Sequence, residues 1–343
     1  MFDIYLPIAD MQFNALILIA IGFSVGVLGG FFGVGGAWVV TPALNIFGFP
    51  MAYAIGTDLA HIFGKSIVAT AKHRKMGNVD MKLGLLSIAG SVVGVEIGAQ
   101  NVMWLTKLGI AGPVVRYLYM FLLFGLGIYM LYDYMTKDKR AAAQAAKVAA
   151  AARSGVTPPA KKSWNIPPMI HFPASGITIS LWTVCGVFLF TGWLSGLLGV
   201  GGGFIRMPAL IYLIGCPTAI AVGTDLFSVL FSGAYGCFTY GVKARVEIVA
   251  AVLMLIGAAI GAQVGVTAVK YIRGYGIRLL FAIMIILAGS SVALKQFQMN
   301  TAAAWLVMSA ALGMCVVIMV KLWNGFKKEQ AEKAAYSVKE VQP

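Results

Sequence analysis

The chain has 343 residues, 60% of them hydrophobic and only 11% charged, and its formal net charge is +14. So little charge cannot cover the surface of a soluble domain of this size, which excludes a soluble protein. The lysines and arginines lie in loops between apolar stretches, as the positive-inside rule predicts for membrane proteins, so the positive charge does not indicate a nucleic-acid partner.

Apolar segments follow one another along almost the whole chain, and many are long enough to cross the ~30 Å hydrocarbon layer as helices. Backbone polar groups in lipid must be paired internally, so the composition predicts a helical bundle in the bilayer. In chain order the segments are 15–48, 51–71, 83–105, 114–135, 176–213, 218–240, 247–270, 276–294 and 301–323. The first and the fifth are too long for a single crossing.

The two halves of the chain repeat the same motifs. Gly-Val-Gly-Gly at 33–36 returns 166 residues later at 199–202, and Pro42 and Pro208 follow the two copies at the same distance. Two further blocks return in the same order, Gly-Thr-Asp-Leu at 56–59 and 223–226 and Gly-Ala-Gln at 98–100 and 261–263. Three matched blocks in one order indicate a duplication, and glycine-interrupted apolar segments in both halves are typical of transporters.

The glycine motif lies near the middle of the two longest segments. Glycine costs about 1 kcal/mol in a helix interior, so a run of glycines should open the helix. Each segment is then either one long kinked helix or a hairpin. In the hairpin a short helix, about 37–47 or 203–213, returns to the side from which the chain entered.

Loop charge favours the hairpins. The strongly basic regions are 72–82, 137–162, 270–278 and the tail after Lys321. All of them fall on one side if both long segments are hairpins, which predicts a cytoplasmic linker and C-terminus and an external N-terminus. Corresponding segments then run in opposite directions, so the halves are predicted to be inverted repeats.

The predicted fold is therefore an all-α polytopic membrane protein with two inverted repeats. Each repeat holds a glycine-broken, re-entrant helix hairpin followed by three spans, and one extra C-terminal helix completes the chain. We expect a first membrane repeat at 1–135, a cytoplasmic Ala/Lys-rich linker with a short helix at 136–175, a second repeat at 176–295, an additional transmembrane helix at 296–323 and a mobile cytoplasmic tail at 324–343. The additional helix is a candidate for packing or homodimer contacts.

The glycine motifs are candidate anion sites. A glycine-rich opening before a short helix leaves backbone N–H groups at the positive end of the helix dipole, where anions bind. The alternative is that the glycines only allow close helix packing. No Gly-Lys-Ser/Thr follows, so a nucleotide P-loop is not indicated. The candidate residues are Gly33, Gly35, Gly36, Gly199, Gly201, Gly202 and Gly203.

Arg206 comes three residues after Gly203, and the equivalent position of the first half is Val40. A charge that deep in a span costs several kcal/mol unless it is paired or hydrated, so it indicates a functional site. The planar guanidinium suits sulfonate, sulfate, phosphate or carboxylate groups. The alternative is a structural ion pair with an aspartate or with Glu96.

Asp58, His61 and Lys65 follow one another at spacings of three and four, which places them on one face of a helix. Asp58 corresponds to Asp225 of the second half. Acidic and histidine side chains within a span are typical stations of a proton relay, so Asp58, His61 and Asp225 are candidates for proton coupling and Lys65 for anion binding. The alternative for each aspartate is helix capping.

Five more polar residues complete the candidate set. Thr57 and Thr224 could bind substrate if they line a cavity, although capping suits them better. Gln100 and Gln263 each end a Gly-x-x-x-Gly stretch that predicts close helix contacts, and their amides could bind substrate or bridge helices. Glu96 has no counterpart in the second half and is either a partner of Arg206 or a proton-coupling site.

Catalytic chemistry is not indicated. The three histidines are scattered, the four cysteines lie in apolar segments without paired spacing, and no nucleophile–base or metal-ligand motif stands out. We therefore expect no enzymatic activity, no cofactor and no metal. The chain also has no ATP-binding motif, which argues against a primary pump.

The glycine motif continues to Pro-Ala-Leu in both halves, at 33–44 and 199–210, and each copy is followed by Gly-Thr-Asp-Leu. This paired pattern resembles the sulfite exporter TauE/SafE family, also called the toluenesulfonate uptake permease family. The resemblance covers roughly residues 15–135 and 180–295. It implies a carrier that moves sulfite, sulfonates or other sulfur-containing or organic anions across the bacterial or archaeal cytoplasmic membrane.

The residues and the resemblance together predict a secondary transporter for a small anion, most simply sulfite, a sulfate-like anion or an organosulfonate. It would lie in the cytoplasmic (inner) membrane and work by alternating access, one repeat rocking against the other, with proton coupling left open. The alternatives are an anion channel, a carrier of a non-sulfur organic anion, and an intramembrane enzyme or scaffold.

Overall fold

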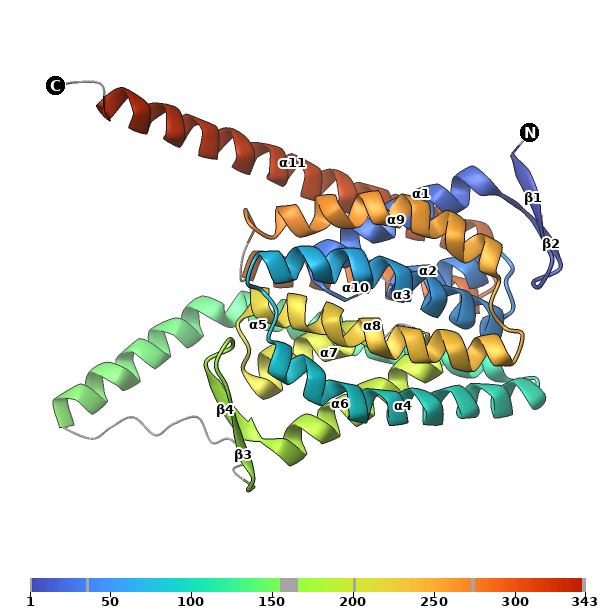
Figure 1. Cartoon of the computed structure of the whole chain (residues 1–343), viewed down its shortest axis with the longest axis horizontal. Coiled ribbons are helices and arrows are strands. Elements are labelled where there is room, and N and C mark those ends of the chain that lie inside the picture. Colours follow the sequence, from blue (N-terminus) through green and yellow to red (C-terminus); the bar gives the residue numbers. More distant parts are fainter. Residues whose placement is uncertain (1, 35–36, 155–165, 200–201, 273–274, 341–343) are drawn as a thin grey trace.

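The computed structural model describes residues 2–34, 37–154, 166–199, 202–272 and 275–340. It confirms the all-α class, because helices form the bundle (Figure 1). In chain order they are α1 (Ala15–Phe32), α2 (Ala37–Ile46), α3 (Met51–Lys75), α4 (Met81–Lys107), α5 (Ala111–Ser154), α6 (Leu181–Leu198), α7 (Gly203–Ala209), the π-helix η1 (Leu210–Ile214), α8 (Thr218–Val242), α9 (Ile248–Ala268), α10 (Tyr275–Gln296) and α11 (Asn300–Glu340).

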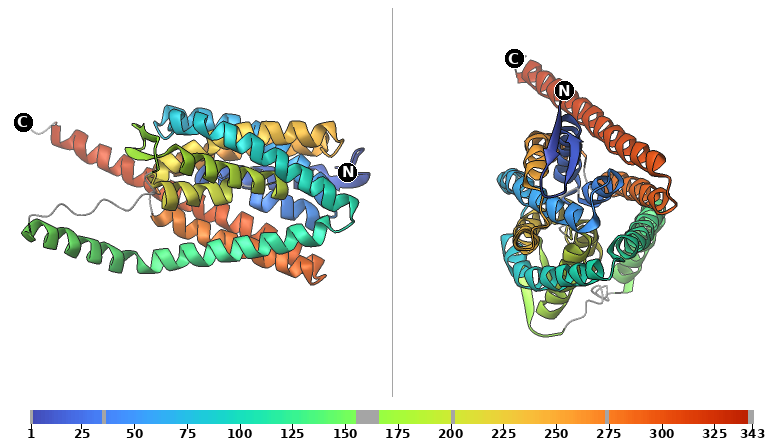
Figure 2. Two further views of the ribbon diagram at one scale, coloured as in Figure 1. Left: turned by 90° about the horizontal axis from the view of Figure 1, so that it is seen from below. Right: turned by 90° about the vertical axis from the view of Figure 1, so that its right-hand side faces the viewer.

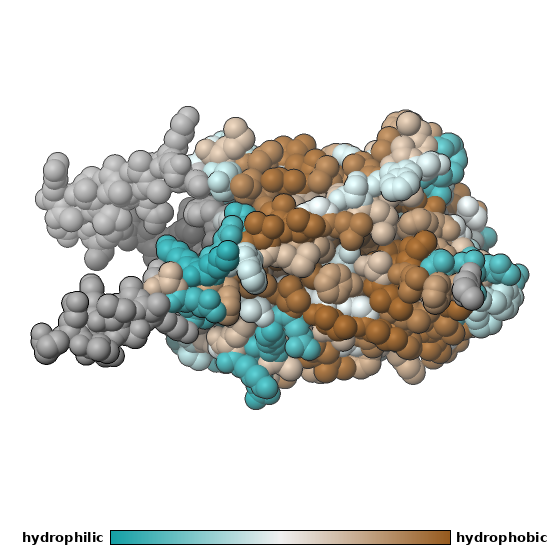
Figure 3. All heavy atoms as spheres, turned by 90° about the horizontal axis from the view of Figure 1, so that it is seen from above, coloured by the Kyte–Doolittle hydropathy of each residue, from teal (hydrophilic) through white to brown (hydrophobic). Residues whose placement is uncertain are grey.

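Eight of the described helices are long and apolar enough to cross a membrane. α3 is not among them, although it has 25 residues, because its polar side chains lower its mean hydropathy. It packs against α8 and α9. Figure 3 shows apolar side chains over the middle of the face in view and hydrophilic ones towards its ends. The chain is thus a multi-pass membrane protein.

Helices of the two halves pack closely through glycine. α1 lies along α9, and α4 lies along α6. A Cβ atom at Gly98 of α4 would lie 2.1 Å from the carbonyl oxygen of Trp193, and one at Gly261 of α9 would lie 2.2 Å from that of Phe23. The prediction that these Gly-x-x-x-Gly stretches make close helix contacts is therefore confirmed, since only glycine lets the backbones approach this far.

The packing is reciprocal between the halves. The first long helix of each half, α1 or α6, packs on the corresponding helix of the other half, α9 or α4. In the same way α3 of the first half packs on α9, and the corresponding α8 of the second half packs on α4. In detail, a Cβ at Gly56 would lie 2.2 Å from the oxygen of Arg245, and one at the equivalent Gly223 would lie 2.1 Å from that of Asn78. The two halves thus meet through equivalent surfaces.

Two short β-hairpins, which the sequence did not predict, lie at opposite ends of the bundle (Figure 1). They are β1 (Asp3–Leu6) with β2 (Met11–Asn14), and β3 (Met169–Phe172) with β4 (Ile177–Ser180). Glu247, at the start of α9, accepts hydrogen bonds from the backbone of Ile8 (2.7 Å) and Ala9 (3.0 Å) in the first hairpin. Asp80, at the start of α4, accepts one from the backbone of Ser175 (3.1 Å) in the second.

The long apolar segments are divided into separate helices at the glycine motifs. α1 ends at Gly33 (φ +78°) and α6 ends at Gly199 (φ +74°), both in the left-handed conformation that glycine adopts without strain. The rings of Phe47 and Phe49, directly after α2, lie with their centroids 5.7 and 6.0 Å from that of Phe13 in β2.

The π-helix η1 explains a shift between the repeated halves. Pro42 and Pro208 are 166 residues apart, whereas Asp58 and Asp225 are 167 apart. η1 lies between Pro208 and Asp225 in the second half. A single π-turn accommodates one inserted residue within a helix. The extra residue is therefore absorbed in η1, and the equivalent helices keep the same faces inward.

The segments expected to be linker and tail continue as helices. α5 runs on to Ser154 and α11 to Glu340, so helix extends into the expected linker and through most of the expected tail. Both helices project from the same end of the bundle (Figures 1 and 2). We call this the linker end and the opposite one the β1–β2 end. Residues 155–165 of the expected linker lie outside the described residues.

Alanine at Gly33 or Gly199 is expected to destabilise the protein. A Cβ atom would lie 2.6 Å from the Cα of Val222 in the first case and 2.8 Å from that of Ile55 in the second. The left-handed backbone adds roughly 1 kcal/mol of strain, so we expect a loss of about 2 kcal/mol or more. Thermal unfolding in detergent measures it. Gly186→Ala is the matched control, because nothing lies within 4 Å of its Cβ position; equal melting temperatures would contradict the close contacts.

Candidate functional site

The two glycine motifs meet inside the bundle. Gly33 packs on Val222 of α8, and Gly199 packs on the equivalent Ile55 of α3. A Cβ atom at Gly203 would lie 2.6 Å from the carbonyl oxygen of Val34, so the two motifs touch each other. The close approach of the backbones is thus sufficient to require glycine at Gly33, Gly199 and Gly203. The candidates Gly35, Gly36 and Gly201 lie outside the described residues.

Arg206 is fully buried beside the second motif. Its Nε donates to Oγ1 of Thr191 at 3.3 Å, and its guanidinium lies 5.5 Å from the ring centre of Phe188. A Cβ atom at Gly202 would come within 2.8 Å of Nη2, so the glycine makes room for the guanidinium.

Asp225 lies opposite this guanidinium. Oδ1 of the carboxylate is 3.7 Å from Nη1 of Arg206, and both side chains are fully buried. This distance is longer than a hydrogen bond. Within the described part of the chain, neither Nη atom and neither carboxylate oxygen has a hydrogen-bond partner. The pair therefore balances charge, and the terminal N–H donors of Arg206 make no hydrogen bond within the described ranges.

A second buried polar cluster lies on α3, where the predicted stripe is buried as expected. Oγ1 of Thr41, on α2, donates to Oδ2 of Asp58 at 2.8 Å. Nδ1 of His61 is 3.4 Å from the other carboxylate oxygen. His61 Nε2 and Lys65 Nζ have no hydrogen-bond partner among the described residues, and all these side chains are fully buried.

The two clusters are built alike. Asp58 and Asp225 occupy equivalent positions on α3 and α8, helices that pack against each other. Each carboxylate faces the short helix of its own half, through Thr41 on α2 or Arg206 on α7. Counted as ionised, the clusters hold two carboxylates and the two cations Lys65 and Arg206, so their charges balance. Paired charges are the form in which a buried polar site is tolerated.

Tyr119 of α5 packs beside the second glycine motif. Its ring stacks on Phe204 of α7 with centroids 6.4 Å apart, and its hydroxyl donates to the carbonyl of Leu198 at 2.7 Å. The hydroxyl also lies beside Thr41. Sequence reasoning missed Tyr119 and Thr191, because no repeat or spacing marks them. Thr41 could have been found, since it directly precedes Pro42 in the repeated block.

Thr57 and Thr224 lie at helix junctions. Thr57 Oγ1 accepts the backbone N–H of Glu247 at 2.9 Å, and Thr224 Oγ1 accepts that of Asp80 at 2.8 Å. Each threonine thus joins the inner helix of one half to the start of α9 or α4 in the other. Both hydroxyls therefore bind the backbone at a helix start of the other half.

Three candidates lie away from the buried clusters. Gln100 and Gln263 are exposed on the outer faces of α4 and α9. Glu96 is half-buried and accepts hydrogen bonds from Tyr235 (3.1 Å) and Thr239 (3.2 Å) on α8. Glu96 is therefore not the partner of Arg206, a role that Asp225 takes instead.

Comparisons with known proteins agree with this architecture. The family model of the sulfite exporter TauE/SafE matches residues 18–292. The probable membrane transporter protein YunE of Bacillus subtilis is 26% identical over 283 residues, 80% of this chain and 95% of the relative. The probable membrane transporter protein MJ0441 of Methanocaldococcus jannaschii is 29% identical over 220 residues (60% and 66%). The probable membrane transporter protein YdhB of Bacillus subtilis is 26% identical over 253 residues (73% and 88%).

No solved structure matches the chain significantly. The family match covers most of the sequence, including both glycine motifs, Asp58, Arg206 and Asp225. The relatives are described as membrane transporters rather than enzymes. The chain therefore belongs to the sulfite exporter TauE/SafE family of membrane transporters.

Proposed function

We propose that the protein is a secondary transporter that binds a small oxyanion at Arg206 and carries it across the cytoplasmic membrane by alternating access. The substrate class is sulfite, a sulfate-like anion or an organosulfonate. One observation carries the proposal: Arg206 is fully buried, yet neither terminal nitrogen has a hydrogen-bond partner among the described residues. A buried donor pair without acceptors is costly unless a ligand fills it.

The alternating movement follows from a proposed inverted-repeat arrangement. Equivalent helices exchange contacts between the halves, and the equivalent β-hairpins lie at opposite ends of the bundle (Figure 1). α1–α2 and α6–α7–η1 would be re-entrant hairpins whose glycine breaks meet at the bilayer midplane. Rocking of one half against the other would expose Arg206 to each side in turn.

The orientation follows from charge. The α3–α4 loop, the α9–α10 loop, the start of the linker and the C-terminal helix all lie at the linker end (Figure 1). These are the strongly basic regions of the chain, so we place the linker end in the cytoplasm and the β1–β2 end outside.

Charge balance supports proton coupling. The buried clusters hold two carboxylates and two cations, so a bound anion adds one negative charge to a site that is already balanced. An unbalanced buried charge costs several kcal/mol. Protonation of Asp225, which faces Arg206 at 3.7 Å, would cancel that charge and free the guanidinium for the anion. The transporter would then carry one proton with each anion charge bound.

A panel of sulfite, sulfate, thiosulfate and small organosulfonates tests the proposed function, with acetate and phosphate as non-sulfur comparisons. A substrate present at a hundredfold excess over its Kd should stabilise the purified protein by about 2.7 kcal/mol, seen as a raised melting temperature. The same anion should show saturable uptake into proteoliposomes. Stabilisation by acetate or phosphate alone would identify a non-sulfur carrier. Linear uptake without saturation would identify a channel instead.

A further inference from the structure

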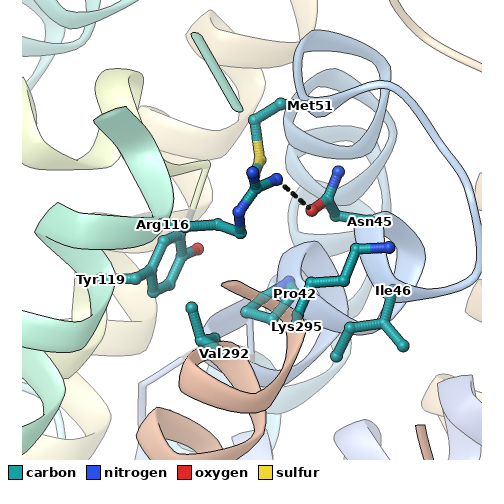
Figure 4. Close-up of a pocket in the computed structure, with 8 residues that line it drawn as sticks. All are labelled: Pro42, Asn45, Ile46, Met51, Arg116, Tyr119, Val292 and Lys295. Carbon is teal, nitrogen blue, oxygen red and sulfur yellow. Dashed lines mark hydrogen bonds between the residues drawn. The ribbon is translucent and has the colours of Figure 1, made fainter. Parts of the chain in front are cut away.

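A second group of cations lies at the β1–β2 end, outside the central clusters. Arg116 of α5 and Lys295 of α10 border one small pocket together with Asn45, at the end of α2, and Tyr119 (Figure 4). Nε of Arg116 donates to Oε1 of Gln296 at 2.8 Å, and Nη1 reaches Oδ1 of Asn45 at 3.4 Å. Across the described ranges, no carboxylate pairs with Arg116 or with Lys295.

The repeat shows what this pocket corresponds to. Arg116 and Arg278 are 162 residues apart, as are Gly127 and Gly289 in the same two helices. At this offset Lys295 corresponds to Asp133. The pocket at the β1–β2 end is therefore the counterpart of the region around Arg278 and Asp133 at the linker end.

The counterpart is a closed ion-pair cluster. Nη1 of Arg278 lies 3.5 Å from Oδ2 of Asp133, and its Nη2 donates to Oγ1 of Thr218 at 3.1 Å. The hydroxyl of Tyr212 donates to the same carboxylate oxygen at 2.9 Å. Arg116 thus reaches Asn45 at the end of α2, and Arg278 reaches Thr218 at the start of α8. In one copy a carboxylate neutralises it, and in the other Lys295 stands in the place of that carboxylate.

This charge reversal runs against the general distribution of charge in the chain. Membrane insertion favours lysine and arginine at the cytoplasmic end, here the linker end. At the β1–β2 end two half-buried cations instead border one pocket, with no carboxylate partner in the part of the chain that the structure describes. Like charges held together this way repel each other and attract an anion.

We propose that the Arg116–Lys295 pocket is the mouth through which the substrate oxyanion is recognised at the β1–β2 end, an inference that rests on the proposed anion transport. Tyr119 connects the mouth to the central site, because it borders the pocket and also stacks on Phe204 beside the glycine motif. The cavity volume is about 10 Å³, room for a single water molecule, so the mouth is closed here and must widen to admit an anion. The Asn45–Arg116 contact links that widening to α2.

The electrostatic character of the mouth can be measured with a reporter thiol. A Cβ atom at Gly112 would lie 3.2 Å from Nη1 of Arg116, so Gly112→Cys places a thiol next to this guanidinium. Its modification rate is compared for anionic sulfonatoethyl methanethiosulfonate and cationic trimethylammonioethyl methanethiosulfonate. Labelling of the protein without Gly112→Cys is subtracted as background, because Cys185 and Cys237 are half-exposed.

The anionic reagent should react faster with the Gly112→Cys protein, once both rates are divided by those for free cysteine. Adding Lys295→Asp recreates the carboxylate of the equivalent Asp133 and should lower the anionic-to-cationic rate ratio by about tenfold or more, since several kT of local potential change sign. Lys295→Met should fall in between. Lys107→Asp is the matched control: it makes the same charge change at a lysine of the same end that is exposed to solvent, and it should alter the ratio less than Lys295→Asp does.

Two results would contradict the proposal that this pocket is the mouth. One is the absence of any preference for the anionic reagent in the Gly112→Cys protein. The other is an equal change of the rate ratio in Lys295→Asp and Lys107→Asp. If Lys295→Asp does not fold, the rate ratio of Lys295→Met is compared with that of Lys107→Asp instead. The labelling requires no transport, so its failure is separate from failure of the proposed function. If the protein transports anions but shows no preference for the anionic reagent, the proposed function stands and the proposed mouth is wrong.

Discussion

Arg206→Gln is expected to abolish anion binding and flux. Glutamine removes the charge and the planar pair of donors, and each charge-assisted hydrogen bond to an oxyanion contributes about 1.5–3 kcal/mol. Two such bonds correspond to a loss of at least about a hundredfold in affinity. Arg206→Lys keeps the charge but not the fork, so we expect a loss of roughly tenfold. Titration of the melting temperature with the transported anion, followed by uptake into proteoliposomes, measures both variants.

A control must separate lost binding from lost folding. Arg206→Gln leaves Asp225 buried without its cation, which alone costs about 3–5 kcal/mol. The double variant Arg206→Gln with Asp225→Asn removes both charges and should regain much of that stability while remaining unable to bind the anion. A stable double variant that still binds and transports with wild-type affinity would show that Arg206 is a structural residue and that the substrate site lies elsewhere.

Asp225→Asn is expected to keep anion binding and to lose proton coupling. Asparagine cannot take up a proton, and it leaves Arg206 permanently without its counter-charge. The anion should therefore stabilise this variant more than it stabilises the wild type, because it supplies the missing negative charge. Uptake should equilibrate the anion, but a pH gradient should no longer drive accumulation above the external concentration.

Asp58→Asn is the comparison for this experiment, because Asp58 occupies the equivalent position and already accepts a hydrogen bond from Thr41 at 2.8 Å. We expect it to retain coupling with reduced rate. If Asp58→Asn abolishes pH-driven accumulation and Asp225→Asn does not, the proton is carried by the Asp58–His61 cluster, and the charge-balance mechanism at Arg206 is wrong.

The membrane class and the duplicated architecture could be predicted from sequence because both depend on features that repeat along the chain. Apolar segments of sufficient length identify the spans, and matched glycine blocks identify the helix breaks. The burial of Asp58, Arg206 and Asp225 was predictable for a related reason, since a charge within an apolar segment must face the interior or a partner.

The pairing of these charges could not be read from the sequence. Whether Arg206 meets Asp225 or Glu96 depends on how the two halves pack, which is a tertiary property. In the structure Glu96 meets Tyr235 and Thr239 of α8 instead. Gly94 and Gly98 face α6 across a close contact, and a residue two positions from each points to another side of the helix.

The two β-hairpins and η1 were missed for local reasons. Strands of four residues are too short to show an alternating pattern against an apolar background. A π-turn has no composition of its own, and only the change of offset from 166 to 167 between the repeats marks it. Tyr119 was missed because tyrosines are common at helix surfaces, and its role depends on a neighbour 79 residues away, the carbonyl of Leu198.

Counterflow in proteoliposomes tests the central claim most directly. Vesicles that contain the protein are loaded with unlabelled sulfite, or with whichever anion of the panel stabilises the protein, and are diluted into a trace of the radiolabelled anion. A carrier whose single site at Arg206 faces each side in turn should take up label transiently above its equilibrium level, and vesicles with the Arg206→Gln, Asp225→Asn double variant should not. Label that only approaches equilibrium without an overshoot, or an overshoot that survives in the double variant, would contradict the account.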